Sequence, residues 1–289
     1  MANAAKRRLE NVPGDFFVDE SCIDCDACRW IAPHTFTQAG DQSAVHQQPQ
    51  SPQQRMAALQ ALVSCPTASI GATDKATQAQ TSRAVATLPR AIDGNVFHCG
   101  FHAESSFGAA SWLIVRPGGN VLVDSPRFAM PLVKRIEAMG GLHTLFLTHR
   151  DDIADHDKWA AHFGCKRVMH ADDARGLKID QTLQGRDQLQ LADDLLVIGT
   201  PGHTRGSACL LHAKRHLFTG DHLAWSARRG QLIGFRDACW YSWPEQIESM
   251  KALQSLSFEW VLPGHGRLHH ASAADMATSL ARCVEWMEK

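Results

Sequence analysis

The chain has 289 residues, which exceeds one typical domain and predicts either two domains or one large domain with an appendage. With 29 basic and 30 acidic side chains and no basic stripe, neither a nucleic-acid partner nor an anionic membrane partner is expected. The chain contains no run of 18 apolar residues, and four of its nine cysteines cluster in one pattern, so we expect a protein of the reducing cytoplasm.

The first motif along the chain is a set of four cysteines. Cys22, Cys25 and Cys28 are separated by two residues each, and a distant Cys65 is followed directly by Pro66. Such gaps let three thiolates surround one cluster, while the remote Cys-Pro supplies the fourth ligand. Spaced cysteines also bind zinc, so a zinc site is the alternative, but this pattern favours an iron–sulfur cluster.

Residues 12–73 resemble a single-cluster bacterial-type ferredoxin, which is a small α+β domain. The residues around the cysteines carry the resemblance, because Phe-Phe-Val-Asp-Glu-Ser precedes Cys22 and Cys-Pro-Thr-Ala-Ser-Ile begins at Cys65. The resemblance implies one [4Fe-4S] cluster bound by Cys22, Cys25, Cys28 and Cys65. A second cluster is not expected, since only one set of four ligands is present.

A spacer, a helix and a linker surround the fourth cysteine. Residues 47–54 form a polar loop with two prolines, and apolar residues at three- and four-residue spacing predict a short helix over residues 55–63. The small polar residues after position 74 show little periodicity, which is typical of a linker. We predict a cluster domain over residues 1–75, a linker over residues 76–90 and a second domain over residues 91–289.

Short apolar runs punctuated by glycine predict alternating strands and helices in the second domain. The predicted strands are residues 112–115, 121–124, 145–147, a run near Val168, 195–200, 208–212, 216–219 and 260–262. The predicted helices are residues 131–139, a helix through Trp159 and Phe163 that Asp155 caps, residues 244–256 and residues 271–286. This order suggests two sheets sandwiched between helices, although periodicity alone leaves other mixed folds open.

An apolar strand over residues 145–147 runs directly into a loop of metal-ligand side chains. The loop carries His149, Asp151, Asp152, Asp155 and His156. So many nitrogen and oxygen donors within eight residues are costly to leave unpaired in a folded chain, which makes a bound cation the economical explanation. A solvated acidic loop is the alternative for this stretch alone.

Three later strands end in the same way as this one. Each apolar run is followed by glycine and then by a ligand residue, which is His203, Asp221 or His265. Glycine lets the backbone turn sharply and approach a site closely. Each pair is weak evidence by itself, but several strand ends that carry histidine or aspartate predict one shared metal centre.

Residues 91–289 resemble the metallo-β-lactamase superfamily of binuclear metallohydrolases. In that family a His-x-His-x-Asp-His motif, a Pro-Gly-His-Thr histidine, a bridging Asp in Thr-Gly-Asp and a Pro-Gly-His-Gly histidine bind two metals in an αββα sandwich. The resemblance implies this fold and the metal ligands His149, Asp151, Asp155, His156, His203, Asp221 and His265.

The first motif departs from the family pattern. Asp151 stands where the family has its second histidine, and the loop before Asp155 is two residues longer. Counted back from Asp155, the position of the replaced ligand falls on Ile153, which cannot bind a metal. The number of divalent ions, one or two, therefore stays open, and a domain that binds a metal without catalysis is a further alternative.

The resemblance implies a hydrolase in which a metal-bound hydroxide attacks an ester, thioester, lactone or similar bond of a small-molecule substrate. Asp155 would orient the water and Asp221 would bridge the metals. Zinc is the first expectation, and the carboxylate of Asp151 favours iron or manganese as alternatives. The same carboxylate also resembles the diiron branch of the superfamily, so the alternative is an oxidoreductase fed by the cluster and by a redox partner protein.

Overall fold

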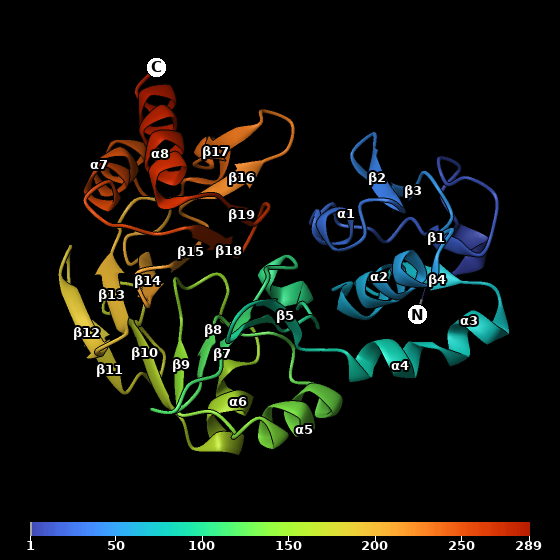
Figure 1. The fold of residues 1–289 in the computed structure, drawn as a ribbon, viewed down its shortest axis with the longest axis horizontal. Helices are drawn as coiled ribbons and strands as arrows, with labels where there is room; N and C mark the ends of the chain where they lie inside the picture. Colours follow the sequence, from blue (N-terminus) through green and yellow to red (C-terminus); the bar gives the residue numbers. More distant parts are fainter. Residues whose placement is uncertain (1) are drawn as a thin grey trace. The chain divides into compact units, whose positions relative to one another are not determined.

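The structure is a computed structural model that describes residues 2–289, and residue 1 of the predicted cluster domain lies outside them. The chain divides into two compact units. Unit 1 comprises the chain up to Arg116 together with Pro126–Leu142, and unit 2 comprises Pro117–Ser125 and His143–Lys289. Figure 1 labels most of the helices and strands of both units.

Unit 1 contains short strands and helices. Its elements are η1 (Ala4–Lys6), β1 (Phe16–Val18), α1 (Ala27–Ile31), β2 (Phe36–Ala39), β3 (Gln42–Val45), α2 (Pro52–Ser64), β4 (Ile70–Ala72), α3 (Lys75–Ala79), α4 (Thr81–Ala86), β5 (Arg90–Asp93), β6 (Val96–His98), η2 (Glu104–Ser106), β7 (Trp112–Ile114) and α5 (Met130–Ala138).

The first part of unit 1 has two small antiparallel sheets and helix α2. Strand β1 pairs with β4, and β2 pairs with β3. Helix α2 confirms the helix predicted over residues 55–63 and begins three residues earlier, because Pro52 stands at its start and Ser51 accepts a hydrogen bond from the Gln54 amide. Phe16, Phe36 and Leu59 are fully buried and form its core.

The segment predicted as a linker contains helices α3 and α4. Asp74 caps α3 by accepting a hydrogen bond from the Ala76 amide. Thr77 and Ala84 are buried, and Thr77 Oγ1 accepts a hydrogen bond of 2.7 Å from Arg55 on α2. The small residues of this segment therefore pack against helix α2. A composition of small polar residues without periodicity does not reveal such packing.

The last part of unit 1 is an antiparallel run of strands followed by helix α5. Strand β6 pairs with β5 on one side and with β7 on the other. Helix α5 agrees with the helix predicted over residues 131–139, and its buried face carries Leu132, Val133 and Ile136.

Unit 2 holds the remaining elements. They are β8 (Val121–Val123), β9 (Thr144–Phe146), α6 (His156–Phe163), β10 (Lys166–His170), β11 (Gln181–Leu183), β12 (Gln188–Ala192), β13 (Leu195–Gly199), β14 (Ala208–His212), β15 (His216–Gly220), β16 (Ala224–Ser226), β17 (Gln231–Ile233), η3 (Arg236–Ala238), α7 (Trp243–Leu253), β18 (Trp260–Pro263), β19 (His269–His270) and α8 (Ala273–Met287).

Unit 2 contains a parallel run of strands and a six-stranded mixed sheet. Strands β8, β9, β10 and β11 are parallel neighbours in that order, with Leu122 opposite Leu145. The second sheet has the order β12-β13-β14-β15-β18-β19, in which β15 and β18 are parallel. Parallel neighbours bring their carboxyl ends to the same sheet edge, which is where the ligand loops begin.

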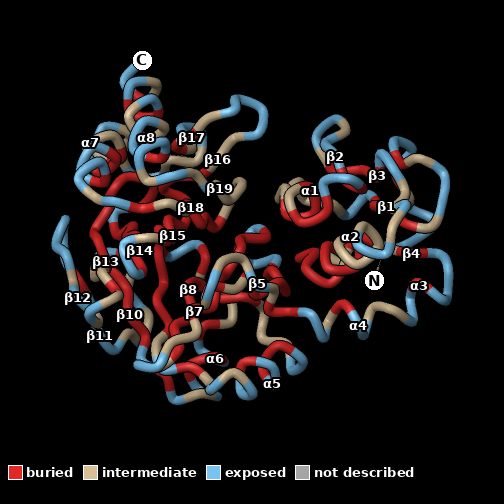
Figure 2. The backbone as a smooth tube through the Cα atoms, in the orientation of Figure 1, coloured by how far each residue is buried: buried red, intermediate tan, exposed pale blue. Residues whose placement is uncertain are grey.

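Helices α7 and α8 cover one face of the mixed sheet. Strand residues Leu211, Leu217 and Val261 pack with Met250 of α7 and with residues of α8 in one buried cluster. Figure 2 shows the resulting buried interior along β13, β14, β15 and β18. Strands β14 and β15 are buried along their whole length, so they appear in the sequence as continuous apolar runs rather than alternating ones.

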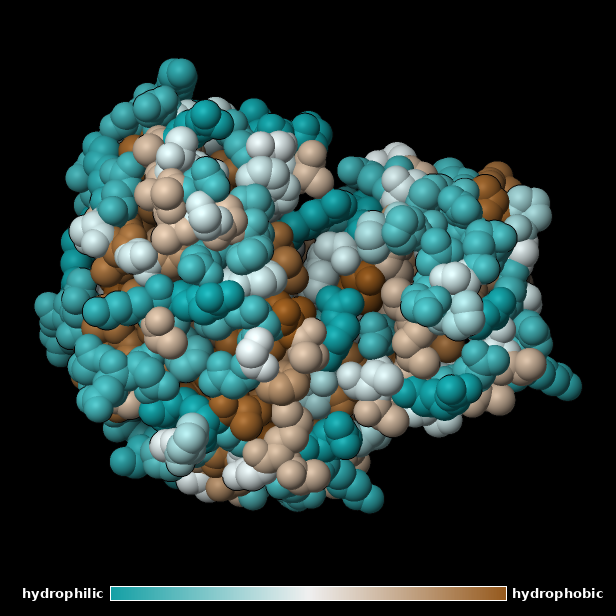
Figure 3. All heavy atoms as spheres, in the orientation of Figure 1, coloured by the Kyte–Doolittle hydropathy of each residue, from teal (hydrophilic) through white to brown (hydrophobic). Residues whose placement is uncertain are grey.

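Hydrophilic residues predominate on the face drawn in Figure 3. The exposed large hydrophobic residues among those described are Leu9, Phe107, Met130, Trp240 and Tyr241. Within residues 2–289, the helices lack the combined length and apolarity that crossing a membrane requires.

Candidate metal centres

The four motif cysteines meet in unit 1. Cys22, Cys25, Cys28 and Cys65 line one small cavity together with apolar residues of the same segment, among them Val18 and Ile70. Cys22 and Cys25 lie on the loop before helix α1, Cys28 lies in α1, and Cys65 lies at the C-terminal end of helix α2. The spacing predicted this convergence, and four thiols around one cavity are the donor set that a [4Fe-4S] cluster requires.

Backbone amides point at the cysteine sulfurs. The amide of Ser43 lies 3.5 Å from Cys22 Sγ, and the amide of Ser69 lies 3.3 Å from Cys65 Sγ. Such N–H groups stabilise the negative charge of a cluster, and they are among the features that set its reduction potential. Burial raises the pKa of the Cys25 thiol to about 12, so without bound iron this thiol stays protonated.

The second centre lies in unit 2, where strand ends deliver its side chains. His149 follows β9, His203 follows β13, Asp221 follows β15 and His265 follows β18. The loop after His149 adds Asp151 and Asp152. The structure therefore brings together all the predicted ligands of this centre except Asp155 and His156.

Two groups of ligand atoms share His149. One consists of His149, Asp151 and His203, and the other consists of His149, Asp152 and Asp221. His149 Nε2 lies 3.8 Å from Asp221 Oδ2 and 3.9 Å from Asp152 Oδ2. His203 Nε2 lies 3.5 Å from Asp151 Oδ2 and 3.7 Å from Asp221 Oδ2.

These separations fit ligands arranged around cations. Metal–ligand bonds of 2.0–2.2 Å in tetrahedral geometry place neighbouring ligand atoms about 3.4 Å apart. Asp152 Oδ1 and Oδ2, His149 Nε2 and His203 Nε2 are buried and have no hydrogen-bond partner among the described residues. Buried polar atoms without a partner are costly, so this donor set suits one or two divalent ions.

Burial and neighbouring charges shift the pKa values of the residues in this centre in different directions. Burial raises the pKa of Asp152 well above its usual value, and the neighbouring Asp221 adds to the effect. Burial also favours neutral Asp221, but His265, His149 and His203 outweigh it and hold its pKa below the usual value. Burial lowers the pKa of His149 to about 4, which leaves its ring neutral and able to bind a metal.

Two aspartates outside the predicted set hold the ligand loops in place. Asp124 Oδ1 accepts a hydrogen bond of 2.8 Å from the amide of Thr148, directly before His149. Asp173 Oδ2 accepts hydrogen bonds from the Arg150 amide at 3.1 Å and from Thr204 Oγ1 at 2.5 Å. Asp173 thus ties the loop of His149 to the loop of His203, and no sequence signal near Asp173 pointed to this role.

Two glycines let the loops approach the centre closely. A Cβ on Gly220, whose φ is +49°, would lie 2.3 Å from Thr148 Oγ1. A Cβ on Gly264 would lie 2.5 Å from Asp152 Oδ2 and 3.0 Å from Asp221 Oδ1. The Gly-Asp and Gly-His pairs of the sequence therefore reflect a steric requirement of the site.

The structure places Asp155 and His156 at the start of helix α6. Asp155 is the residue before α6 and pairs with Lys158 Nζ at 2.7 Å. His156 begins α6, and its Nε2 lies 3.7 Å from Asp157. The buried aspartate of this loop that lies beside His149 and Asp221 is Asp152.

The aromatic residues after Asp221 lie in different surroundings. The amides of Trp240 and Tyr241 donate to the carbonyl of His203, and both side chains are largely exposed. Trp243 packs against the core cluster of α7 and α8, and Trp225 stacks on His269 at 3.9 Å. Of these four aromatic residues, Trp240 and Tyr241 are therefore the two that bond to the loop of His203.

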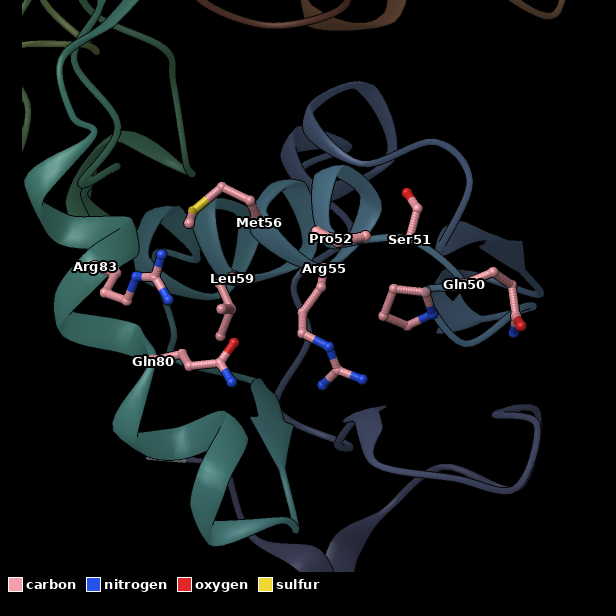
Figure 4. A pocket seen from close by; sticks show the side chains of 9 residues that line it. Gln50, Ser51, Pro52, Arg55, Met56, Leu59, Gln80 and Arg83 are labelled. Atoms are coloured by element: carbon pink, nitrogen blue, oxygen red, sulfur yellow. The ribbon is translucent and has the colours of Figure 1, made fainter.

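A separate pocket lies in unit 1 beside helices α2 and α4 (Figure 4). Its walls include Met56, Leu59, Arg55 and Arg83, and Arg55 also bonds to Thr77. None of its lining residues is a histidine, cysteine or carboxylate. This pocket therefore lacks the side chains that bind metals or transfer protons.

Comparisons with known proteins bear on both regions. Residues 18–72 match the family profile described as the 4Fe-4S single cluster domain of Ferredoxin I. A comparison with curated proteins finds no match for this sequence.

Solved structures with a similar fold include several metallo-β-lactamases. VMB-1 is 16% identical with a TM-score of 0.52, and the match covers 69% of this chain and 95% of that chain. DIM-1 is 20% identical with a TM-score of 0.53, covering 68% and 95%. FIM-1 from Pseudomonas aeruginosa, in its mono-zinc form, is 15% identical with a TM-score of 0.51, covering 68% and 93%.

These likenesses confirm the predicted fold class, in which an αββα sandwich follows a small α+β segment. The chain joins an iron–sulfur domain of the ferredoxin type to a metallo-β-lactamase fold.

Proposed function

We propose that the protein is a metal-dependent hydrolase whose centre binds two divalent ions. His149, Asp151 and His203 would hold one ion, Asp152 and His265 would hold the other, and Asp221 would be shared. The observation that carries this proposal is the buried carboxylate of Asp152, which lies 3.9 Å from His149 Nε2 and has no hydrogen-bond partner among the described residues.

A divalent ion at such a centre lowers the pKa of a coordinated water and polarises the bond to be cleaved. The chain's own residues would position the reactants and receive the proton. Asp152 and Asp221 supply buried negative charge. Asp151 is 43% exposed at its side chain, and the nearby His203 lowers its pKa, so it is ionised and able to bind an ion at the solvent side of the centre, where bulk water can receive the proton.

Substrates with an apolar group fit the surroundings of His203. Trp240 and Tyr241 are 65% and 48% exposed, and the Trp240 ring centroid lies 6.4 Å from that of His203. Exposed aromatic side chains beside a metal centre offer a contact surface for an acyl or alkyl group. Arg205 pairs with Asp172 at 3.4 Å on the surface, so it is a weaker candidate for substrate binding. An ester, thioester or lactone of a small molecule is the class we propose.

An oxidoreductase is the second candidate, and a specific observation favours it. The centre contains three aspartates, and hard oxygen ligands favour iron or manganese over zinc. The ferredoxin-type segment on the same chain would then supply electrons through its cluster.

The experiment compares both activities in the full chain with its cluster intact. Anaerobically purified protein is loaded in turn with zinc, manganese or ferrous iron, and the hydrolysis of an ester, a thioester and a lactone is followed. In parallel, the consumption of oxygen and of nitric oxide is measured with dithionite-reduced protein. Asp221→Ala, which removes the shared ligand, serves as the control for metal-dependent rates.

Hydrolysis that depends on the added metal and is lost in Asp221→Ala would support the proposal. Oxygen or nitric oxide consumption by the iron-loaded protein, without hydrolysis under any metal, would favour the second candidate instead.

A further inference from the structure

Residues beyond the ferredoxin-type segment pack against the cluster cysteines within unit 1. Gly108 has φ +84°, and a Cβ there would lie 2.7 Å from Cys25 Cβ and 2.9 Å from Cys25 Sγ. The amide of His102 donates to the carbonyl of Ser64, directly before Cys65. Residues outside the matched segment 18–72 therefore lie directly against Cys25 and against the residue before Cys65.

Arg127 lies beside the C-terminal end of helix α2, which leads into Cys65. Its guanidinium donates to the carbonyl of Val63 at 2.6 Å and lies 5.7 Å from the ring centroid of Phe101. Arg127 is half-buried, and no carboxylate among residues 2–289 pairs with it. Burial lowers the pKa of Arg127, and the charge of Cys65 acts in the opposite direction, which places the two groups within electrostatic reach.

Arg29 provides the contrast within the same cavity region. Its guanidinium is buried, but it pairs with Asp24 at 2.7 Å and also with Asp26. Two carboxylates therefore compensate the charge of Arg29. Within residues 2–289, the partners of the Arg127 guanidinium are a carbonyl and an aromatic ring, and neither carries a compensating negative charge.

We infer that Arg127 is a tuning residue of the iron–sulfur cluster, which raises the cluster's reduction potential from outside the ferredoxin-type segment. The inference concerns the cluster alone and does not rest on the chemistry proposed for the second metal centre.

The physical reason is the change of charge on reduction. A cluster that takes up one electron from an external donor gains one negative charge, and an uncompensated cation nearby stabilises the reduced state more than the oxidised state. Half-burial strengthens this effect, because solvent screens the interaction less than at the surface. The fixed bond from Arg127 to Val63 keeps the cation near Cys65 in both states.

The test is a redox titration of the cluster in the full-length protein. Anaerobic wild type, Arg127→Gln, Arg127→Met and Arg127→Lys are titrated with dithionite, and the reduced cluster is followed by electron paramagnetic resonance. Arg83→Gln, which removes an exposed arginine of unit 1, is the matched control. Iron and sulfide contents are measured for every variant.

We expect each neutral variant that keeps its cluster to hold about tenfold less reduced cluster at a fixed potential. For a one-electron couple this corresponds to a shift of about 59 mV to more negative potential. Arg127→Lys should stay near wild type, because it retains the charge, and Arg83→Gln should not shift.

Three outcomes would overturn the inference. A neutral variant with full iron content and an unchanged potential would show that the charge does not act on the cluster. A shift in Arg127→Lys as large as in Arg127→Gln would show that the effect is structural. Loss of the cluster in both neutral variants, with retention in Arg127→Lys, would give Arg127 a role in assembly instead of tuning.

Discussion

The two metal-binding regions of this chain are built in opposite ways. The candidate cluster ligands all come from the stretch between Cys22 and Cys65, and three of them lie within seven residues. The candidate ligands of the second centre come from strand ends and adjoining loops between His149 and His265, and their positions depend on the register of the sheets. A site whose residues are mostly close in sequence can be inferred from spacing, whereas a site assembled from distant strand ends needs the fold.

This comparison predicts that the cluster segment is the more fragile region. Cys25→Ser removes one of four ligands, and so small a segment has little core of its own without its cluster. We expect loss of the brown colour and of nearly all cluster iron and sulfide, together with increased proteolysis within residues 12–73. Colour, iron and sulfide analysis and limited proteolysis measure this.

The second centre serves as the internal control for that variant. Its divalent metal content should stay near the wild-type value, because none of its ligands comes from the cluster segment. A Cys25→Ser protein with full iron and sulfide content would show that Cys25 is not a cluster ligand.

Asp221→Ala should have the largest effect on the second centre. Asp221 is close to both candidate ion positions, with His265 Nδ1 at 2.9 Å and His203 Nε2 at 3.7 Å. Its removal would leave two cations facing each other without the shared anion. We expect divalent metal content to fall close to zero, measured by mass spectrometry after equilibration in metal-buffered solution.

The exposed Asp237 offers a matched control for this loss of charge. Asp237→Ala should keep the wild-type metal content. Equal metal content in Asp221→Ala and wild type would remove Asp221 from the ligand set.

Asp152→Asn and Asp155→Asn together test which aspartate of the loop binds a metal. Asp152 is buried beside Asp221 and Gly264, while Asp155 pairs with Lys158 in front of α6. Asp152→Asn should lose one metal per chain, and Asp155→Asn should retain both. Metal analysis in which Asp155→Asn loses a metal and Asp152→Asn does not would restore the assignment suggested by the family motif.

The difference between these two aspartates shows what the sequence can and cannot predict. The cysteine spacing predicted that the four motif cysteines share one cavity. The strand ends and the glycines before the ligand residues predicted that His149, His203, Asp221 and His265 lie close together. The family motif suggested Asp155 because an Asp-His pair stands there, but the two extra loop residues move that pair onto a helix start. The path of the loop in the structure, which the sequence does not reveal, places Asp152 beside His149 and Asp221.

The positioning residues were outside the reach of sequence reasoning for a different reason. Asp124 and Asp173 bind backbone amides and hydroxyls of distant loops, and such contacts leave no spacing pattern. Gly108 likewise lies against Cys25, and Arg127 lies within electrostatic reach of Cys65, although both cysteines are far away in the sequence. The segment predicted as a linker was missed for a third reason. Its small polar residues form helices α3 and α4, in which Thr77 is buried and bonds to Arg55 of α2.

Asp173→Asn should weaken the second centre without abolishing it. Asp173 holds the loops of His149 and His203 through the Arg150 amide and Thr204 Oγ1, and the loss of such support typically costs 10–100-fold in metal affinity. Competition with a chromophoric chelator measures the affinity. Asp172→Asn, which removes a surface partner of Arg205, is the adjacent control and should not change it.

The smallest expected effect is a pH dependence that belongs to Asp124. Burial raises the pKa of Asp124 to about 7 in the folded protein, although hydrogen bonds from Thr148 oppose this, whereas its ordinary value is 3.8. The folded state therefore holds a proton that the unfolded state releases between pH 3.8 and about 7, so rising pH reduces stability in this window.

Asp124→Asn has no such proton. The quantity to compare is the free energy of unfolding of metal-free Asp124→Asn minus that of metal-free wild type. This difference should increase as the pH rises from 5 to about 7, by at most about 1.4 kcal/mol per pH unit, and it should level off above pH 7. Urea unfolding of both proteins at pH 5.5, 6.5, 7.5 and 8.5 measures this difference, and effects common to the cluster segment cancel in the comparison. Wild type loaded with divalent metal should lose the trend, because nearby cations stabilise the ionised carboxylate. A constant difference across the whole range in metal-free protein would show that Asp124 is already ionised at pH 5.5, and that its bonds to Thr148 outweigh its burial.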